Sequence, residues 1–165
     1  MVGRGGGSGP ELAQQAGRAA ELFWAGGASQ MYSELRRLTR LGYLRERREP
    51  AKTRPRTVYA LTGAGRGAMR RWLAEPSRYP RVQHEAGVRV AAADLGDAHA
   101  VVESLRALRA DLPRLEGLVG EIEARAAKFP HRARYLRLEM SLARRLITAH
   151  REWVDEVERE LGETR

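Results

Sequence analysis

Hydroxyl and guanidinium side chains recur at helical spacing between Ser29 and Arg40. On a 3.6-residue period, Met31, Leu35 and Leu38 form an apolar stripe that would face a core. The opposite face carries hydroxyls and arginines, with further polar residues at its edges: Ser29, Ser33, Arg36 and Arg40, flanked by Tyr32 and Arg37. Small hydroxyls allow close approach, and arginines bind phosphates or the O6/N7 edge of guanine. The pattern therefore predicts a helix that fits the major groove of DNA.

The residues after this helix predict a β-hairpin with a basic tip. Gly42 is a natural helix stop, because glycine tolerates the left-handed cap conformation. Residues 44–49 can form a strand, residues 50–55 are a polar tip bounded by two prolines, and residues 56–61 form a β-branched and aromatic return strand. The order of helix, strand, tip and strand is that of a winged helix, and the wing places three cations where DNA could pass, namely Lys52, Arg54 and Arg56.

Two more helices complete the predicted first half. Residues 8–23 have an apolar face, with Ser8 or Gly9 as the cap, and Gly26-Gly27 breaks the chain before the next helix. This short break is typical of a helix-turn-helix. A further helix is expected from Thr62 to about Glu75, and the proline-bounded residues 76–80 read as a linker.

The second half reads as helices only. We expect a small, alanine-rich helix over residues 81–93, a long helix from Asp97 to about Lys128 that Pro113 kinks or interrupts, and a last helix over residues 131–161. The apolar residues alternate spacings of three and four, as in a coiled coil. We predict that they hold a homodimer, through Leu105, Leu108, Leu112, Leu115, Leu138, Leu142, Leu146 and Trp153. Two copies would present two recognition helices one DNA turn apart, matching a palindromic site.

Positive charge is concentrated in the first half of the chain. Residues 1–78 hold fifteen basic and six acidic residues, a net charge of +9, whereas residues 79–165 hold fifteen of each. Clustered positive charge is typical of proteins that bind polyanions, although a charge run can also be a solvated face. The excess lies in the segment that holds the predicted helix and wing, which favours DNA binding.

The composition argues against several other classes of protein. The sequence has no cysteine, so it predicts no disulfide framework and no thiolate metal site. Its four histidines are scattered and no HExxH pattern or nucleophile elbow occurs, so we expect no enzyme, no metal and no cofactor. No apolar run approaches about eighteen residues. The glycine-rich start is no signal peptide. We therefore expect no membrane partner and a cytoplasmic, nucleoid-associated protein.

Two features have alternative interpretations. Gly63, Gly65 and Ala68 match a loose dinucleotide fingerprint, but the parallel strand that the fingerprint needs is absent from the pattern that follows. We interpret them as a helix N-terminus packed closely under the wing. Trp153 and Tyr135 could line a pocket for a small hydrophobic effector between helices, although core packing explains both as well.

The first half resembles the PadR family of bacterial transcriptional regulators. The resemblance rests on three runs, which are Phe23-Trp24 with residues 29–35 and Leu38, Gly42-Tyr43-Leu44, and residues 58–66; residues 8–13 are similar to the start of the family's second helix. It implies a dimeric winged-helix repressor that leaves DNA when an effector or stress signal arrives. By position it assigns DNA contacts to Ser29, Gln30, Tyr32, Ser33 and Arg37, and the wing to residues 52–56.

The chain departs from this family at its start. The family has an amphipathic first helix before the segment that begins at Ser8, and here nine mostly glycine residues stand in its place. This departure leaves an alternative function open: an interaction module that dimerises through its C-terminal helices and whose DNA binding is non-specific or impaired.

The sequence thus predicts a mainly α-helical protein. Its expected parts are a flexible glycine-rich tail over residues 1–9, a winged helix-turn-helix with a two-stranded wing over residues 10–76, and a coiled-coil-like dimerisation and effector domain over residues 77–165. The expected function is that of a ligand- or stress-responsive repressor, which binds double-stranded DNA at a palindromic operator as a homodimer.

Overall fold

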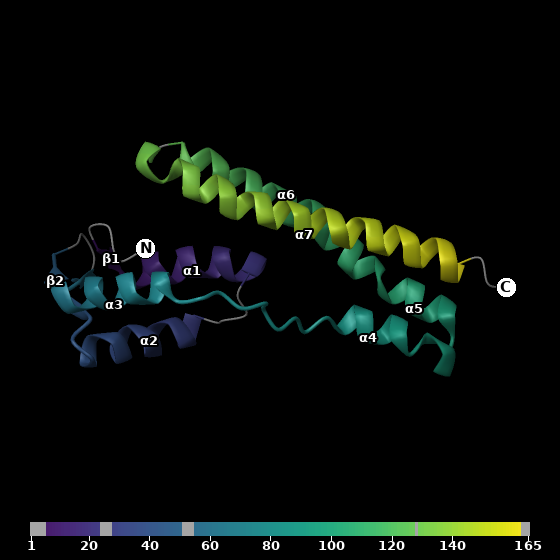
Figure 1. Ribbon diagram of the computed structural model, residues 1–165, viewed down its shortest axis with the longest axis horizontal. Helices are drawn as coiled ribbons and strands as arrows, with labels where there is room; N and C mark the ends of the chain where they lie inside the picture. The colour runs from purple at the N-terminus through teal and green to yellow at the C-terminus, as the bar shows by residue number, and fades with distance from the viewer. Residues whose placement is uncertain (1–5, 24–27, 51–54, 128, 163–165) are drawn as a thin grey trace. The chain divides into compact units, whose positions relative to one another are not determined.

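The computed structural model describes residues 6–23, 28–50, 55–127 and 129–162. It divides the chain into two compact units, Met1–Tyr79 and Pro80–Arg165. The described part of the first unit consists of helices around a small sheet, and that of the second consists of helices (Figure 1).

The first unit has the element order that the sequence predicts, with one strand added. Its elements are β1 (Gly7–Ser8), α1 (Gly9–Phe23), α2 (Ala28–Arg40), β2 (Leu44–Glu49), β3 (Arg56–Leu61) and α3 (Gly63–Ala74). The sheet order is β1-β3-β2 and both pairings are antiparallel. In the wing, which is the β2–β3 hairpin, Leu44 pairs with Leu61 and Glu49 with Arg56. The predicted bounds of both wing strands are confirmed.

The added strand, β1, lies in the segment that was predicted to be a flexible tail. Gly7 pairs with Tyr59 and Ser8 with Val58, so the expectation of a flexible tail is wrong for these residues. The Ser8 N–H donates to Glu11 Oε2 at 2.9 Å, and the Glu11 N–H donates to Ser8 Oγ at 3.4 Å. This reciprocal capping box starts α1 while the sheet holds the residue before it. Residues 1–5 of the predicted tail lie outside the described residues.

The core of the first unit takes one buried side chain from each of four elements. Leu12 of α1, Leu35 of α2, Leu44 of β2 and Tyr59 of β3 are the buried members, and Met31, Leu38 and Leu61 pack against them. The apolar stripe predicted for residues 29–40 therefore faces the core, as expected from its helical period.

The start of α3 is fixed against the wing. Thr62 caps it, because the Gly65 N–H donates to Thr62 Oγ1 at 3.0 Å and that hydroxyl donates to the Gly42 carbonyl at 2.7 Å. Gly65 is buried, and a Cβ there would lie 2.1 Å from the Tyr43 carbonyl oxygen. Close packing thus explains the glycine, and the dinucleotide interpretation has no support.

The second unit is built on a helical hairpin. Its elements are α4 (Glu85–Ala91), the 3-10 helix Ala93–Leu95, α5 (Ala98–Ser104), α6 (Arg106–Ala126) and α7 (Pro130–Gly162). Helices α6 and α7 lie side by side (Figure 1). Both helices bury apolar side chains: Leu112, Leu118, Val119 and Ala126 of α6, and Met140, Ala143, Ile147, Val154 and Val157 of α7.

The long helix predicted from Asp97 to about Lys128 is interrupted, but not at Pro113 as predicted. The chain turns at Leu105, between α5 and α6, and α6 continues through Pro113. Leu105 is 1% exposed and packs with Val154 and Val157, so tertiary contacts hold the turn at a place that local sequence does not mark. The helix predicted over residues 81–93 is also shorter, because it begins at Glu85 and ends at Ala91.

Candidate nucleic-acid interface

Helix α2 is closed at its end by backbone hydrogen bonds. The Leu41 N–H donates to the Arg37 carbonyl at 3.0 Å, and the Tyr43 N–H donates to the Leu38 carbonyl at 3.0 Å. Gly42 has a φ of 71°, the left-handed conformation that glycine adopts without strain. The chain enters β2 after three residues, so α2 and the wing follow each other closely.

The predicted DNA-contact residues of α2 share its solvent face. All of them are exposed: Ser29, Gln30, Tyr32, Ser33, Arg36, Arg37 and Arg40. Leu35, on the other face, is 3% exposed. The burial of this apolar face leaves the hydroxyl, amide and guanidinium groups available to a ligand. Their chemistry suits phosphates and base edges.

Arg37 is exposed, but its charge is compensated. Its Nε and Nη2 donate to the two carboxylate oxygens of Glu34 at 2.8 and 2.7 Å. The hydrogen bond to Glu34 raises the pKa of Arg37, and the same bond lowers the pKa of Glu34. A phosphate or guanine must compete with this carboxylate for Arg37, which sequence reasoning did not anticipate.

Two neighbours of Arg37 on this face are also held in place. The Ser33 hydroxyl donates to the Gln30 carbonyl at 2.8 Å, so it faces a ligand chiefly as an acceptor. The Tyr32 ring lies over the start of α1, where a Cβ on Gly9 would come within 2.9 Å of Tyr32 Cε1. The Tyr32 ring therefore contacts the start of α1.

The three cations predicted for the wing differ in their placement. Lys52 and Arg54 lie outside the described residues. Arg56 opens β3, and its guanidinium donates to Glu11 of α1 at 3.1 Å and to Glu49 of β2 at 3.3 Å. The structure thus gives Arg56 a structural role: it ties the wing to the first turn of α1.

Strand β2 supplies cations that sequence reasoning overlooked. Arg45, Arg47 and Arg48 are exposed, and Arg47 forms an ion pair with Glu49. The signal was present in the sequence, because three arginines in a six-residue strand leave little apolar surface to bury. Their position on the wing extends the basic surface of the first unit beyond α2.

The residues predicted for dimerisation divide into three groups by exposure. Leu105 and Leu112 are 1% and 3% exposed within one copy, so they cannot contact a second copy directly and the prediction is corrected for them. Leu108, Leu115 and Trp153 are half-buried. Leu138, Leu142 and Leu146 remain 64%, 51% and 42% exposed on α7.

Helix α7 therefore has two apolar faces. One packs on α6, and ion pairs flank that contact, including Arg151 with Glu116 at 2.7 Å and Arg109 with Glu158 at 2.8 Å. The other face carries Tyr135 and the three exposed leucines. The α7 leucines predicted for dimerisation lie on this second face, whereas Met140, Ala143 and Ile147, which are buried inside the unit, were not predicted.

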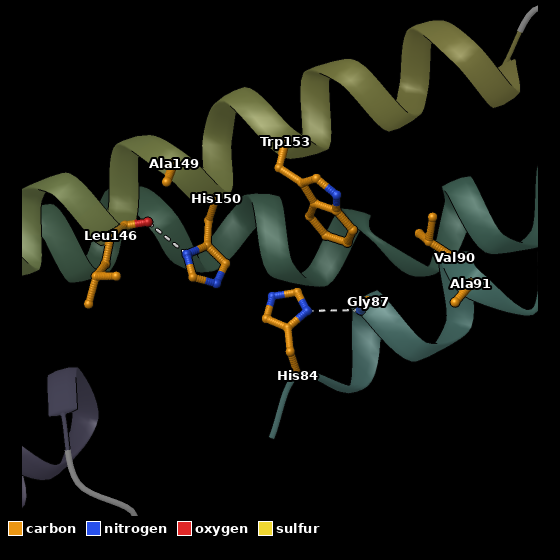
Figure 2. Close-up of a pocket in the computed structure, with 8 residues that line it drawn as sticks. All are labelled: His84, Gly87, Val90, Ala91, Leu146, Ala149, His150 and Trp153. Atoms are coloured by element: carbon orange, nitrogen blue, oxygen red, sulfur yellow. Dashed lines mark hydrogen bonds between the residues drawn. The ribbon is translucent and has the colours of Figure 1, made fainter. Parts of the chain in front are cut away.

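A hollow of about 460 Å³ lies between α4 and α7. It is lined mainly by apolar side chains and two imidazoles, from His84, Gly87, Val90, Ala91, Leu146, Ala149, His150 and Trp153 (Figure 2). Of the two aromatic residues considered for an effector pocket, Trp153 lines this hollow, and Tyr135 is not among its lining residues.

The described residues contain no group of three or more His, Cys, Asp or Glu side chains placed to hold a metal ion. Among the same residues, none of the helices has both the length and the apolar character that a membrane crossing requires.

The fold and this surface define a class of protein. A helix-turn-helix whose second helix shows a polar, basic face beside a β-hairpin is a winged-helix DNA-binding domain. The sequence profile of the "Transcriptional regulator PadR-like family" matches residues 1–71. A Mycobacterium tuberculosis protein named "Probable transcriptional regulator Rv1176c" is 30% identical, over 96% of this chain and 92% of that protein. The chain belongs to the PadR-like family of transcriptional regulators.

Solved structures share the fold at lower identity. Bacillus subtilis PadR in complex with operator DNA has a TM-score of 0.76 and 23% identity, covering 98% of this chain and 92% of that one. The Vibrio cholerae virulence activator AphA has a TM-score of 0.71 and 22% identity, with coverage of 97% and 92%. Bacillus subtilis PadR in complex with p-coumaric acid has a TM-score of 0.63 and 19% identity, with coverage of 98% and 92%.

Proposed function

We propose that this regulator is a sequence-specific repressor that binds a palindromic operator as a homodimer and responds to a small ligand. The observation that carries the proposal is the exposed face of α2, where seven polar and basic side chains sit opposite the buried Leu35. In this proposal residues 10–76 bind DNA and residues 77–165 dimerise and bind the effector. A repressor of chromosomal genes works in the cytoplasm, on the nucleoid.

In this proposal some side chains on the α2 face contact bases and others contact phosphates. Ser29, Gln30, Tyr32, Ser33 and Arg37 would read base edges, because hydroxyl, amide and guanidinium groups match their donors and acceptors. Arg36 and Arg40 would hold phosphates, together with Lys52 and Arg54 of the wing tip and the arginines of β2. Phosphate contacts position the helix, whereas base contacts specify the sequence.

The homodimer is proposed from the second apolar face of α7. Leu138, Leu142 and Leu146 lie on one helical stripe, yet they stay exposed in a single copy. A contiguous apolar stripe in solvent is typical of an interaction site. The same stripe of a second copy would cover it across a twofold axis, and the pair would offer two α2 helices to two half-sites.

The ligand response is proposed from the hollow beside Trp153. Its apolar walls and few polar groups suit a small hydrophobic molecule. The Bacillus subtilis PadR that shares the fold was solved with p-coumaric acid, a small aromatic compound. A compound of that general size would fit a volume of about 460 Å³.

The test is fluorescence anisotropy of the full chain on DNA from its own upstream region. Scrambled DNA of equal length is the competitor, at about 50 and 200 mM salt. We expect binding to the native DNA to be about a thousandfold tighter than binding to scrambled DNA. Arg40→Ala should weaken binding to both DNAs, whereas Arg145→Ala, an exposed arginine on α7, should leave both unchanged.

Weak and equal binding to the two DNAs that vanishes at the higher salt would overturn the proposal. The basic first unit would then be a non-specific polycation, and the interaction-module alternative would replace the repressor.

A further inference from the structure

Two histidines from different helices meet at the hollow in the second unit. His84 precedes α4 and His150 lies on α7, and their ring centroids are 5.0 Å apart. The edge of the Trp153 ring completes the contact, with its centroid 5.1 Å from that of His84. This cluster joins the start of α4 to α7 (Figure 2).

Each imidazole has one nitrogen committed to a backbone group. The Gly87 N–H donates to His84 Nδ1 at 2.8 Å, which makes His84 the N-cap of α4. His150 Nδ1 lies 2.7 Å from the Leu146 carbonyl oxygen, which can only accept, so this nitrogen carries the proton. Neutral His84 therefore holds its proton on Nε2, and neutral His150 leaves Nε2 as a lone pair.

The remaining nitrogen of each ring lies on the side that faces the other ring (Figure 2). In the neutral state one ring presents an N–H group and the other presents a lone pair, so the two faces are complementary. A further proton on His84 must go to Nδ1, where it opposes the Gly87 N–H. A further proton on His150 must go to Nε2, where it opposes the N–H of His84.

We propose that His84 and His150 form a proton-sensitive latch, which holds the start of α4 on α7 while His84 is neutral and releases it when His84 gains a proton. The latch goes beyond the proposed DNA binding and does not depend on it. It is a regulatory device of this unit's own fold.

Two charged side chains that neighbour the histidines in the chain are already paired with other residues. On α4, Glu85 is already paired with Arg89 at 2.6 Å. On α7, Arg151 is paired with Glu116 of α6. Leu105 and Leu108, which pack in the core beneath α4, are apolar. Burial lowers the pKa of His84 below its ordinary value of 6.5, and the charge of His150 lowers it further.

The sign of the pH effect follows from this shift. A histidine whose pKa is lower in the folded state binds its proton more tightly in the unfolded state. The latch therefore contributes its full stability above a pH of about 6.5 and loses it as the pH falls toward the pKa of the folded state. Mild acid should release the start of α4 from α7 and so widen the hollow between them.

The direct test is an NMR titration of the full wild-type chain from pH 8 to pH 5. We expect His84 to titrate below its ordinary value and the Gly87 amide resonance to move with it. Hydrogen-exchange protection of that amide should fall about fivefold as His84 gains its proton, the effect of losing one hydrogen bond. Titration of His84 at or above its ordinary value, or a Gly87 amide that does not follow it, would overturn the latch.

A variant pair isolates the titrating group. His84→Asn keeps a side-chain acceptor at the N-cap but cannot titrate in this range. The loss of thermal stability between pH 7.5 and 5.5 should therefore be smaller than in the wild type. His99→Asn, at an exposed histidine of α5, is the matched control and should behave like the wild type. Equal pH dependence in the His84→Asn variant and the wild type would contradict the proposal, and the wild-type titration stands on its own if the variant fails to fold.

Discussion

Arg37 of α2 faces solvent, yet its guanidinium donates to both carboxylate oxygens of Glu34. An exposed ion pair of this kind contributes little to stability, so DNA can compete for the arginine. The carboxylate stays on the surface that would meet phosphates, where its charge opposes binding. If Arg37 contacts DNA as proposed, Glu34 should reduce the affinity for DNA.

Changing either partner of this pair should alter DNA binding in opposite directions. Glu34→Gln should tighten binding to all DNA about two- to fivefold, because it removes a competing negative charge. Arg37→Ala should weaken binding to the native operator tenfold or more, because a base contact is lost. Fluorescence anisotropy on native and scrambled DNA measures both effects.

The scrambled DNA is the control for Arg37. Equal losses on native and scrambled DNA would show that Arg37 holds phosphate and does not read bases.

Glu11 links the capping of α1 to pH. Hydrogen bonds from the Ser8 backbone and hydroxyl lower the pKa of Glu11, and the charge of Arg56 lowers it further. A carboxylate with a lowered pKa contributes stability above its ordinary value of 4.5, and this contribution is lost as the pH falls through the pKa of the folded state.

We expect Glu11→Gln to lower the stability of the first unit at pH 7 by about 0.3–1 kcal/mol, the typical value of a carboxylate at a helix N-terminus. Glutamine keeps the hydrogen bonds of the capping box but has no charge. Urea denaturation at pH 7 and pH 3 measures the effect. The two proteins should converge at pH 3, and a difference that is unchanged by pH would contradict the assignment.

At the scale of elements, α3 and the wing are joined through a glycine. The start of α3 approaches the Tyr43 backbone so closely that Gly65 has no space for a Cβ. Thr62 then ties the same point to the turn that ends α2. The orientation of the recognition helix relative to the wing therefore depends on this contact.

Gly65→Ala should destabilise the first unit by about 1–3 kcal/mol, the usual cost of overpacking, because the backbone must move. Gly67→Ala is the matched control in the same helix, since the nearest atom to its Cβ would be a flexible arginine end 3.6 Å away. That control should stabilise α3 by about 0.4–1 kcal/mol. Thermal denaturation followed by circular dichroism compares them, and similar effects of both variants would refute the packing account.

At the scale of the whole molecule, α7 has two apolar faces, of which one is covered within the unit. Its buried face, with Met140, Ala143 and Ile147, packs inside the unit, whereas its leucine face stays in solvent. A stable protein interface buries about 1,200–2,000 Å² in total. The leucine face is the natural centre for such an interface between two copies.

Leu142→Glu should shift the protein from dimer to monomer. It should not unfold the protein, because Leu142 is 51% exposed in a single copy. A charge at the centre of an apolar interface is left without a partner, which costs several kcal/mol. Analytical ultracentrifugation gives the mass and circular dichroism the helix content. Leu95→Glu, at a leucine that is 85% exposed outside this stripe, is the control. A Leu142→Glu variant that remains dimeric would place the interface elsewhere.

Local patterns in the sequence determined most of the elements and the faces of α2. The wing strands 44–49 and 56–61, the stop at Gly42 and the apolar stripe of α2 follow from periodicity and turn chemistry, which act over a few residues. Only the tertiary structure decided which face of α7 is buried, that Leu105 turns the chain, and that Arg56 binds Glu11. It also brought His84 to His150. Such contacts join residues far apart in the chain, and a periodic pattern states which side of a helix is apolar but not what will cover it.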